Sequence, residues 1–488
     1  MTQTRSAKST VSVVPGVVAE LRAEQPAWEA LGVDGRVRWV RRYRDWLLDN
    51  EKQLNELVRE DTGKPAAEAP LELMLSIDLA NYYSANAKSF LAAESPKPHN
   101  LFTISKALEI QLRPYPVVGI ITPWNFPLAL TLFDAIPALL AGAAVVTKPS
   151  EYTPRAVEAA VAGWAEIGAP AVFRALSGAA AVGREIINEV DYVQFTGSTR
   201  TGRLVAQQAA SLLIPFGLEL GGKDPAIVLA DADIDHAVAG ITFGGLSNAG
   251  QMCTSVERVY VEAPVHDEFV DKLVAKVQSL RQNADDGYST DLGPMIVDSQ
   301  ADIVEAHVED AVAKGATVRC GGERILGGRF FQATVLTDVD HSMDVMMLET
   351  FGPVLPVMKV ADADEAVRLA NDSPYGLSAS VWTGDKRRGK ELARQLEVGA
   401  VEVNDVQTHL ACFPVPQAGW KSSGVGARLG GAHGITKYCR PHVVTSNRVE
   451  LSLVQALAWF PYSPTKAQVI GRIFRLLGAG DVRRKLGI

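Results

Sequence analysis

The sequence is poor in cysteine and contains no long apolar run. Its four cysteines among 488 residues form no CxxC pair and no spacing typical of a zinc site; they are Cys253, Cys320, Cys412 and Cys439. Because disulfide frameworks and structural metal sites need such clusters, we expect free thiols, no bound metal and a reducing cytoplasm. No stretch of about 18 apolar residues offers a transmembrane helix, and the amino-terminal residues have no signal-peptide core.

The chain also lacks a surplus of positive charge. It carries 48 lysines and arginines against 56 aspartates and glutamates, a net charge of −8. Nucleic-acid-binding proteins usually present a basic surface, so a nucleic-acid partner is not expected. What the chain has instead is length and apolar content, since 47% of its residues are hydrophobic, enough for two or three domains with separate cores.

Short apolar strands alternate with helices over most of the chain. Apolar spacings of three and four predict helices over residues 28–91. A first series has strands expected at 117–121, 143–147, 192–195 and 212–218, with helices at 128–140, 154–167 and 199–210. A second series has strands expected at 258–261 and 355–360, with helices at 266–280, 303–314 and 362–371. Such alternation predicts an α/β fold with parallel sheets covered by helices on both faces.

Two segments depart from this alternation. Residues 96–116 are bounded by prolines and partly alternate apolar with polar side chains, which predicts a strand excursion from the main body. Beyond Val444 the chain has an apolar segment, Leu451–Phe460, followed by a basic stretch that includes Arg472, Arg475, Arg483, Arg484 and Lys485. We interpret this tail as a docked carboxyl-terminal helix, with peripheral attachment to an anionic membrane as the alternative.

Cys253 is the strongest candidate for a nucleophile. It follows a run of small residues, 245–250, that lets the backbone approach a substrate closely. A thiol attacks a carbonyl carbon as the thiolate, so it needs a lowered pKa or a nearby base. Glu219 supplies a carboxylate at the end of an apolar strand, where partial burial would raise its pKa toward the range useful for a base. The alternatives are a small core cysteine and a glutamate held in an ion pair with Lys223 or an arginine.

Asn125 and two further strand ends complete the candidate site. Asn125 lies in Pro-Trp-Asn-Phe-Pro at 123–127, just past a strand, where its amide can donate to a developing oxyanion; a turn-forming asparagine is the plain alternative. The segments 148–151 and 195–198 also lie where a strand gives way to a helix, and the second is a seat for a pyrophosphate. Glu151 can accept both ribose hydroxyls and would repel a 2′-phosphate, which favours NAD over NADP.

Together these motifs resemble those of the aldehyde dehydrogenase superfamily. The likeness runs from about Trp28 to Val444 and is specific as a set of motifs. Besides those at 123–127, 148–151 and 195–198, they are Glu-Leu-Gly-Gly-Lys at 219–223, Gly-Gln-Met-Cys at 250–253, Glu-Thr-Phe-Gly-Pro at 349–353 and Lys-Ser-Ser-Gly at 421–424. Enzymes of this superfamily that oxidise succinate semialdehyde are also similar to the chain.

The resemblance implies residue roles, domains and an assembly. Cys253 would be the nucleophile, Glu219 the general base and Asn125 the oxyanion donor. The dinucleotide would be held by Trp124, Lys148, Glu151, Gly197, Ser198, Glu349 and Phe351. The implied domains are an NAD-binding domain at 1–96 and 114–221, a catalytic domain at 222–436, a small β oligomerisation arm at 97–113 and 437–445, and a carboxyl-terminal extension at 446–488. The assembly would be a homodimer or a dimer of dimers.

The expected reaction is oxidation of an aldehyde by NAD through a thiohemiacetal and a thioester on Cys253, which Glu219 opens by activating water. The helix after Asn125 has no cation, so we expect a small aldehyde with an apolar aliphatic or aromatic body, unless a loop near His409 or Lys421 supplies the charge. The substrate pocket would be formed by Phe126, Leu130, Phe133, Met252 and Thr254. The alternatives are a succinate-semialdehyde dehydrogenase, a CoA-acylating enzyme, which the presence of Glu219 disfavours, and a catalytically silent binding protein.

Overall fold

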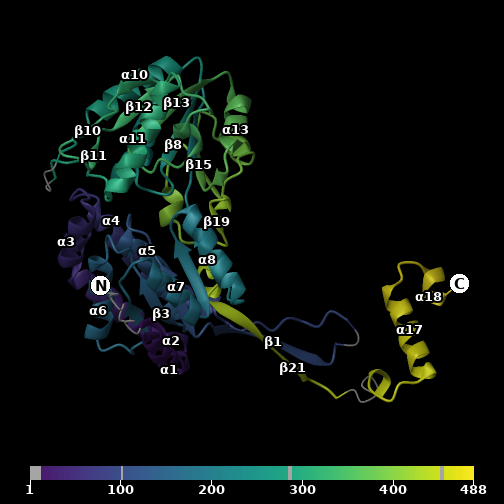
Figure 1. Ribbon diagram of the computed structural model, residues 1–488. Coiled ribbons are helices and arrows are strands. Elements are labelled where there is room, and N and C mark those ends of the chain that lie inside the picture. Colours follow the sequence, from purple (N-terminus) through teal and green to yellow (C-terminus); the bar gives the residue numbers. More distant parts are fainter. Residues whose placement is uncertain (1–11, 101–102, 284–287, 451–455, 488) are drawn as a thin grey trace, which may run out of the picture. The chain divides into compact units, whose positions relative to one another are not determined.

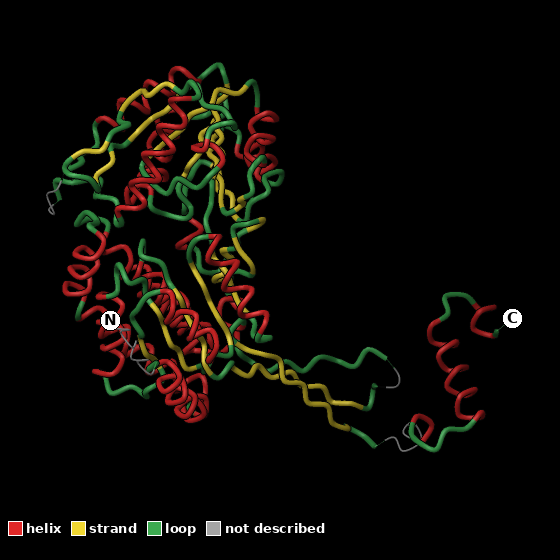
Figure 2. Tube along the Cα trace, in the orientation of Figure 1, coloured by secondary structure: helices red, strands yellow, loops and turns green. Residues whose placement is uncertain are grey.

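The structure is a computed structural model that describes residues 12–100, 103–283, 288–450 and 456–487 (Figure 1). The chain divides into two compact units. The larger unit contains the chain up to Leu91 and Pro114–Arg440, and the smaller one contains Ala92–Arg113 and the chain from Pro441 onward. The larger unit holds two parallel-stranded sheets flanked by helices, so the predicted α/β fold class is confirmed (Figure 2).

The first sheet has six strands in the order β19-β6-β5-β2-β3-β4. Neighbours pair in parallel except β19, which is antiparallel to β6. The strands are β2 (Val117–Ile121), β3 (Ala144–Lys148), β4 (Phe173–Ala175), β5 (Tyr192–Thr196), β6 (Phe216–Glu219) and β19 (Gly424–Val425). Every residue of β2, β3 and β5 is buried, which explains why these strands are continuous apolar runs in the sequence.

Eight helices come from the same part of the chain. They are α1 (Val14–Ala30), α2 (Gly32–Asp49), α3 (Glu51–Thr62), α4 (Ala69–Phe90), α5 (Pro127–Ala141), α6 (Arg155–Glu166), α7 (Ala180–Glu189) and α8 (Thr199–Ser211). Helices α1, α5 and α7 all pack on β2 and β3. Helix α5 is buried along almost its whole length, because α2, α4, α6 and α15 (Ala432–Thr436) cover its other sides.

The second sheet has seven strands in the order β16-β15-β7-β8-β13-β12-β9, parallel except for β9. The strands are β7 (Asp224–Val228), β8 (Val256–Glu262), β9 (Thr317–Cys320), β12 (Thr334–Thr337), β13 (Val354–Val360), β15 (Ser378–Trp382) and β16 (Ala400–Val403). Its helices are α9 (Ile234–Leu246), α10 (His266–Gln278), α11 (Asp298–Ala313), α12 (Asp344–Met347), α13 (Ala363–Asn371) and α14 (Lys386–Ala393). Two clusters of buried apolar side chains contain residues of this sheet and of the helices that pack against it.

Short elements complete the larger unit. The two-residue strands pair as β10 (Arg324–Ile325) with β11 (Phe330–Phe331), β14 (Tyr375–Gly376) with β18 (Trp420–Lys421) and β17 (Pro416–Gln417) with β20 (Arg428–Leu429). Single 3-10 turns occur at η1 (Ser247–Gly250) and η2 (Thr408–Ala411). Strand β19 lies within the range 222–436 expected for a catalytic domain, yet it forms the edge of the first sheet.

In the smaller unit, residues of β1 (Lys106–Pro114) pair with residues of β21 (Cys439–Asn447), in agreement with the predicted strand excursion. The carboxyl-terminal part forms α17 (Pro464–Gly478) and α18 (Val482–Leu486), and neither helix contains a buried residue. A docked helix would bury one face, so this exposure does not support docking within the unit. Among the helices that the structure describes, none has the length and apolarity needed to cross a membrane.

Candidate active site

The carboxyl ends of β2, β5 and β6 carry the residues singled out in the sequence. Asn125 lies in the turn from β2 to α5, Ser198 caps α8 after β5, and Glu219 is the last residue of β6. Because the three strands are parallel neighbours, their carboxyl ends meet at one edge of the sheet. Ligand sites of open α/β sheets form at such edges.

The segment before Cys253 has a left-handed backbone. Asn248, Ala249 and Gly250 have positive φ angles of 52°, 53° and 73°. A Cβ atom at Gly250 would lie 2.1 Å from the carbonyl oxygen of Gly352, so only glycine fits there. Left-handed conformations of non-glycine residues are costly and gather at functional sites. The small residues before Cys253 are therefore required by the backbone path of this loop.

Gln251 joins Asn125 to this cysteine loop. The backbone carbonyl of Gln251 accepts hydrogen bonds from Asn125 Nδ2 and from Asn248 Nδ2, both at 3.0 Å. The Gln251 side chain donates to the carbonyl of Asn248 at 2.8 Å and accepts from the N–H of Ile296 at 2.8 Å. Asn125 Oδ1 is buried and has no hydrogen-bond partner among the described residues. The asparagine is thus held by one N–H of its amide, and the second N–H is left to donate to a ligand.

Gly221 and Gly222 allow close contact between their own segment and the segments that carry Cys253 and Glu349. A Cβ atom at Gly222 would lie 2.5 Å from the carbonyl oxygen of Cys253, and one at Gly221 would lie 2.2 Å from the carboxylate of Glu349. The N–H of Gly222 also donates to Glu349 Oε1 at 3.2 Å. A side chain at either glycine would force these segments apart, so the two glycines after Glu219 and Leu220 serve close approach rather than a simple turn.

Lys223 is paired with Glu257 and not with Glu219. Its Nζ lies 2.6 Å from the Glu257 carboxylate, and both side chains are buried. Glu257 also accepts the N–H groups of Thr350 at 2.7 Å and Phe351 at 2.8 Å. The ion pair therefore fixes the segment that carries Glu349, and the alternative of a Glu219–Lys223 pair is wrong.

Glu219 is buried beside Arg428, a residue that sequence reasoning missed. Burial raises the pKa of Glu219 to about 7, although Arg428 and Lys437 act to lower it. The backbone N–H of Arg428 donates to Glu219 Oε1 at 3.0 Å. A carboxyl group with a pKa near 7 exchanges protons readily at neutral pH, as a general base must.

The guanidinium of Arg428 is neutralised by Asp134 of α5. Arg428 Nε and Nη2 donate to Asp134 Oδ2 at 3.1 and 2.9 Å, and Arg428 also contacts the Thr196 hydroxyl. The other carboxylate oxygen of Asp134 accepts from Lys437 Nζ at 3.2 Å and from the Tyr438 hydroxyl at 2.8 Å. Asp134 is the one charged residue of the apolar helix α5. Because a buried charge needs a partner, this residue could have indicated from the sequence that a buried cation lies opposite it.

The thiol of Cys253 is protonated in this environment. Burial raises its pKa to about 12, Arg428 acts in the opposite direction, and the carboxyl groups of Asp224 and Glu219 add to the increase. Because burial raises the pKa of this thiol, activation by a nearby base is the route that fits the geometry. Glu219 is the group with a pKa suited to that task.

One cavity of about 260 Å³ brings the candidates together. It is lined by all three catalytic candidates, Asn125, Glu219 and Cys253. Of the dinucleotide candidates it is lined by Trp124, Gly197, Ser198, Glu349 and Phe351, and of the substrate candidates by Leu130. Gln300 and Ile303 of α11 also line it and were not expected, because nothing in their local sequence marks them.

The remaining candidates do not line this cavity. Lys148 and Glu151 form an ion pair of 3.2 Å at the end of β3, the neighbour of β2. The centroid of the Phe126 ring lies 3.6 Å from Nζ of Lys64, and the ring of Phe133 packs edge-on against that of Phe413. Met252 is half-buried and Thr254 is buried beside the cysteine.

The lining of the cavity suits a nicotinamide dinucleotide. Ser198 is the N-cap of α8 and accepts from the N–H of Thr201, so this helix begins at the cavity and its N–H groups favour an anion such as a pyrophosphate. Trp124 and Phe351 meet edge-on at a centroid distance of 5.4 Å and offer flat apolar contacts. Burial raises the pKa of Glu349 to about 8, which leaves a carboxyl group able to hydrogen-bond ribose hydroxyls.

Sequence and structure comparisons agree with this geometry. The model of the aldehyde dehydrogenase family matches residues 2–444. A protein of Mycolicibacterium smegmatis named as a putative NADP(+)-dependent succinate-semialdehyde dehydrogenase is 40% identical over 445 residues, which cover 90% of this chain and 86% of that protein. A 4,4′-diapolycopene aldehyde oxidase of Methylomonas is 40% identical over 439 residues, which cover 89% and 82%.

A solved structure is equally similar. That of the aldehyde dehydrogenase PutA of Anabaena variabilis is 39% identical, with a TM-score of 0.84, and the match covers 90% of this chain and 93% of that one. The family match and these relatives identify the chain as an aldehyde-oxidising oxidoreductase, and its two parallel-stranded sheets agree with the solved structure. The chain belongs to the aldehyde dehydrogenase family.

Proposed function

We propose that this chain oxidises an aldehyde to the carboxylic acid in two covalent stages on Cys253, with NAD as hydride acceptor. The observation that carries the proposal is the single cavity in which a thiol, an amide donor and a carboxyl group of pKa about 7 lie together. Each of these groups has one task in thiol-based acyl chemistry.

In the first stage the sulfur of Cys253 bonds to the aldehyde carbon while Glu219 accepts the thiol proton. The carbonyl oxygen becomes an oxyanion, which the free N–H of Asn125 and the backbone N–H of Cys253 stabilise. A dinucleotide held by Ser198, Glu349 and Phe351 would supply the hydride acceptor. Loss of hydride from the carbon leaves a thioester on Cys253.

In the second stage Glu219, having released its proton to solvent, removes a proton from water. The hydroxyl oxygen attacks the thioester carbon, the carbon–sulfur bond breaks, and the sulfur regains a proton. The acid departs and Cys253 is restored. A base is needed here because water is a poor nucleophile. The thiol of CoA is a better nucleophile and would not require a base.

NAD is preferred to NADP in this proposal because of Glu151. Its carboxylate lies at the end of β3 in an ion pair with Lys148, and about 44% of its side chain is exposed. A 2′-phosphate placed there would meet a negative charge. The name of the Mycolicibacterium smegmatis relative specifies NADP(+), so cofactor preference is a direct test of this placement.

The substrate class proposed is an aldehyde with an apolar body. No lysine, arginine or histidine of the described chain lines the cavity, while Glu219 and Glu349 do. Arg428, a buried cation whose backbone contacts Glu219, is bound to Asp134 through its guanidinium. A second carboxylate on the substrate would therefore be desolvated without a partner. Succinate semialdehyde is the second candidate, supported by the name of the Mycolicibacterium smegmatis relative.

The test is NADH formation with hexanal, benzaldehyde and succinate semialdehyde, each with and without CoA. We expect a higher kcat/KM for the two apolar aldehydes and no dependence on CoA. A higher kcat/KM for succinate semialdehyde would refute the apolar substrate, and turnover that requires CoA would refute hydrolysis by Glu219. The variant Cys253→Ala is the control for background oxidation.

The proposal includes the expected domains and assembly. The NAD-binding domain comprises 1–96 and 114–221, the catalytic domain 222–436, and the arm 97–113 and 437–445. In the arm, Ile104 and Val443 are each 59% exposed and Val444 is 41% exposed, as an interface between copies would require. Light scattering on the intact protein tests for a homodimer or a dimer of dimers. A cytoplasmic location is part of the proposal and agrees with four free cysteines.

A further inference from the structure

The segment 456–487 is basic although the chain as a whole is acidic. It contains six basic residues, Lys466, Arg472, Arg475, Arg483, Arg484 and Lys485, against one acidic residue, Asp481, whereas the whole chain has a net charge of −8. Arg484 forms an ion pair with Asp481 at 3.2 Å. Within the described chain no ion pair involves the side chains of Arg472, Arg475, Arg483 or Lys485.

Helix α17 has an apolar face that the described part of its unit does not bury. Val469, Ile473, Leu476 and Leu477 follow one another at spacings of four, three and one, and therefore share one side of the helix. Leu476 and Leu477 are 53% and 56% exposed. Gln468, Arg472 and Arg475 lie on the other side. The helix is amphipathic, and although it contacts α18 none of its residues is buried.

Aromatic side chains precede this helix. Trp459, Phe460 and Tyr462 are 65%, 80% and 73% exposed. Tryptophan and tyrosine rings are favoured at the level of lipid headgroups, where an apolar body and a polar edge are both accommodated, and the phenylalanine ring adds apolar area. Ser463 then caps α17 by accepting from the N–H of Lys466, so the aromatic cluster leads directly into the amphipathic helix.

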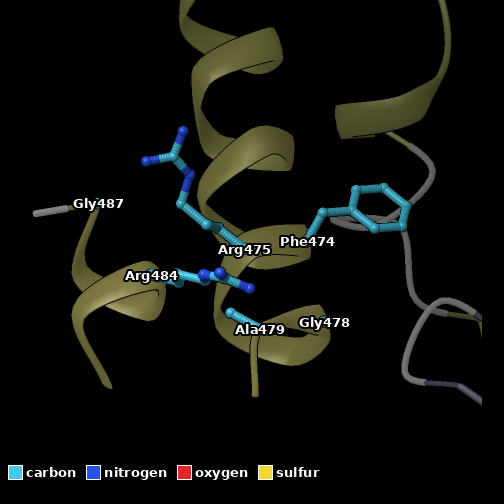
Figure 3. A pocket seen from close by; sticks show the side chains of 6 residues that line it. All are labelled: Phe474, Arg475, Gly478, Ala479, Arg484 and Gly487. Carbon is cyan, nitrogen blue, oxygen red and sulfur yellow. The ribbon is translucent and has the colours of Figure 1, made fainter. Parts of the chain in front are cut away.

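Two arginines border a hollow between α17 and α18. Figure 3 shows Arg475 and Arg484 on the same side of α17, with Phe474 pointing to the opposite side. The hollow has a volume of about 530 Å³ and is also lined by Ala479 and Gly487. Guanidinium groups bind phosphate oxygens through paired N–H donors, so this hollow suits a phosphate headgroup.

We propose that residues 456–487 bind the surface of a bilayer rich in anionic lipids. The apolar face of α17 and the aromatic cluster enter the headgroup boundary, while the arginines remain at the level of the phosphates. At 15 residues and with three basic side chains, α17 is suited to lie in the interface plane rather than to cross it. A second copy of the segment is a poorer partner, because six basic residues on each copy would repel.

The experiment is flotation of the whole protein with lipid vesicles. The vesicles contain phosphatidylcholine alone or phosphatidylcholine with a third of phosphatidylglycerol. We expect the protein to float with the anionic vesicles only and to be released by high salt, because salt screens the attraction. No binding to either kind of vesicle, or equal binding to both, would overturn the proposal, as would displacement by millimolar inorganic phosphate at constant ionic strength.

Two pairs of charge reversals make the test specific. Arg472→Glu with Arg475→Glu should weaken vesicle binding at least about 25-fold, since each basic residue near such a surface strengthens binding roughly fivefold. Lys386→Glu with Lys390→Glu changes the net charge equally at exposed positions of α14 and should leave binding unchanged. If both double variants lost vesicle binding equally, the effect would come from net charge alone, and the proposal of a binding surface on α17 would be refuted.

A third variant tests the apolar face. Leu476→Ser with Leu477→Ser should weaken vesicle binding without any change in aldehyde oxidation in free solution. If this variant instead lowers the oligomeric mass and leaves vesicle binding intact, the face covers a second copy and the membrane proposal is wrong. Because binding is measured without substrate, the result does not depend on the proposed reaction.

Discussion

Replacing Asp134 by asparagine removes the negative charge that pairs with two buried cations, Arg428 and Lys437. Asp134 accepts four hydrogen bonds, two from Arg428 at 3.1 and 2.9 Å, one from Lys437 at 3.2 Å and one from Tyr438 at 2.8 Å. Burial alone would raise the pKa of Asp134, but the two cations hold it below its usual value. The carboxylate is therefore ionised in the folded protein at neutral pH.

Two effects of Asp134→Asn follow. Arg428 and Lys437 keep their charges without a counter-charge, and breaking a buried pair in this way costs about 3–5 kcal/mol of unfolding free energy. The unopposed cations also lower the pKa of Glu219, because Asp134 is among the groups that raise it toward about 7. The acid limb of the kcat/KM profile then moves to lower pH, since Glu219 loses its proton more easily.

The assay combines urea unfolding with the pH dependence of kcat/KM. Asp235→Asn is the matched control, because its carboxylate pairs with Lys272 at 2.8 Å on the surface and is 80% exposed. Arg428→Met is the opposing variant, since loss of this cation raises the pKa of Glu219 and moves the acid limb to higher pH. An Asp134→Asn protein as stable as the control, or acid limbs that move in the same direction in both buried variants, would refute the reasoning.

Further predictions concern the residues around this network. Cys253→Ala should lower turnover by far more than tenfold while dinucleotide binding, followed by fluorescence quenching, is retained; residual activity within about tenfold of the unmodified protein would contradict a nucleophilic role. Glu219→Gln should slow NADH formation in the first turnover as well as in the steady state and should remove the acid limb near pH 7, and an unchanged steady rate would mean that another group activates water. Glu151→Ser should raise kcat/KM with NADP relative to NAD, and a native preference for NADP would show that Glu151 does not face the ribose. Gly222→Ala should abolish activity, since its Cβ would lie 2.5 Å from the Cys253 carbonyl oxygen, and a fully active protein would show that the loop can move.

Much of the fold follows from local pattern. The strands β2, β3 and β5 are short apolar runs because both faces of a parallel sheet are buried, and helices separate them because parallel strands need a crossover. The turn at 123–127 could be placed because its two prolines cannot continue a strand. The ends of elements were less predictable: the expected strand 212–218 begins only at Phe216, since Leu213 has a left-handed backbone and is 92% exposed.

The chemistry of Cys253, Glu219 and Asn125 was visible in the sequence because each lies in a short motif with an unusual local composition. Their electrostatics were not. The sequence left an ion pair of Glu219 with Lys223 or an arginine as an alternative to the general base. Lys223 instead pairs with Glu257, and Arg428 contacts Glu219 through its backbone while its guanidinium pairs with Asp134.

Sequence by itself determined which groups can react, because a thiol, an amide and a carboxyl group are properties of single residues. Tertiary structure decided their protonation states. Asp134 and Arg428 are 294 positions apart in the chain, and only packing of α5 against the β20 segment places them in contact. Burial in the same cavity raises the pKa of Cys253 to about 12 and that of Glu219 to about 7. Desolvation and long-range charge depend on which distant segments exclude water from a site, and no local pattern of residues specifies that.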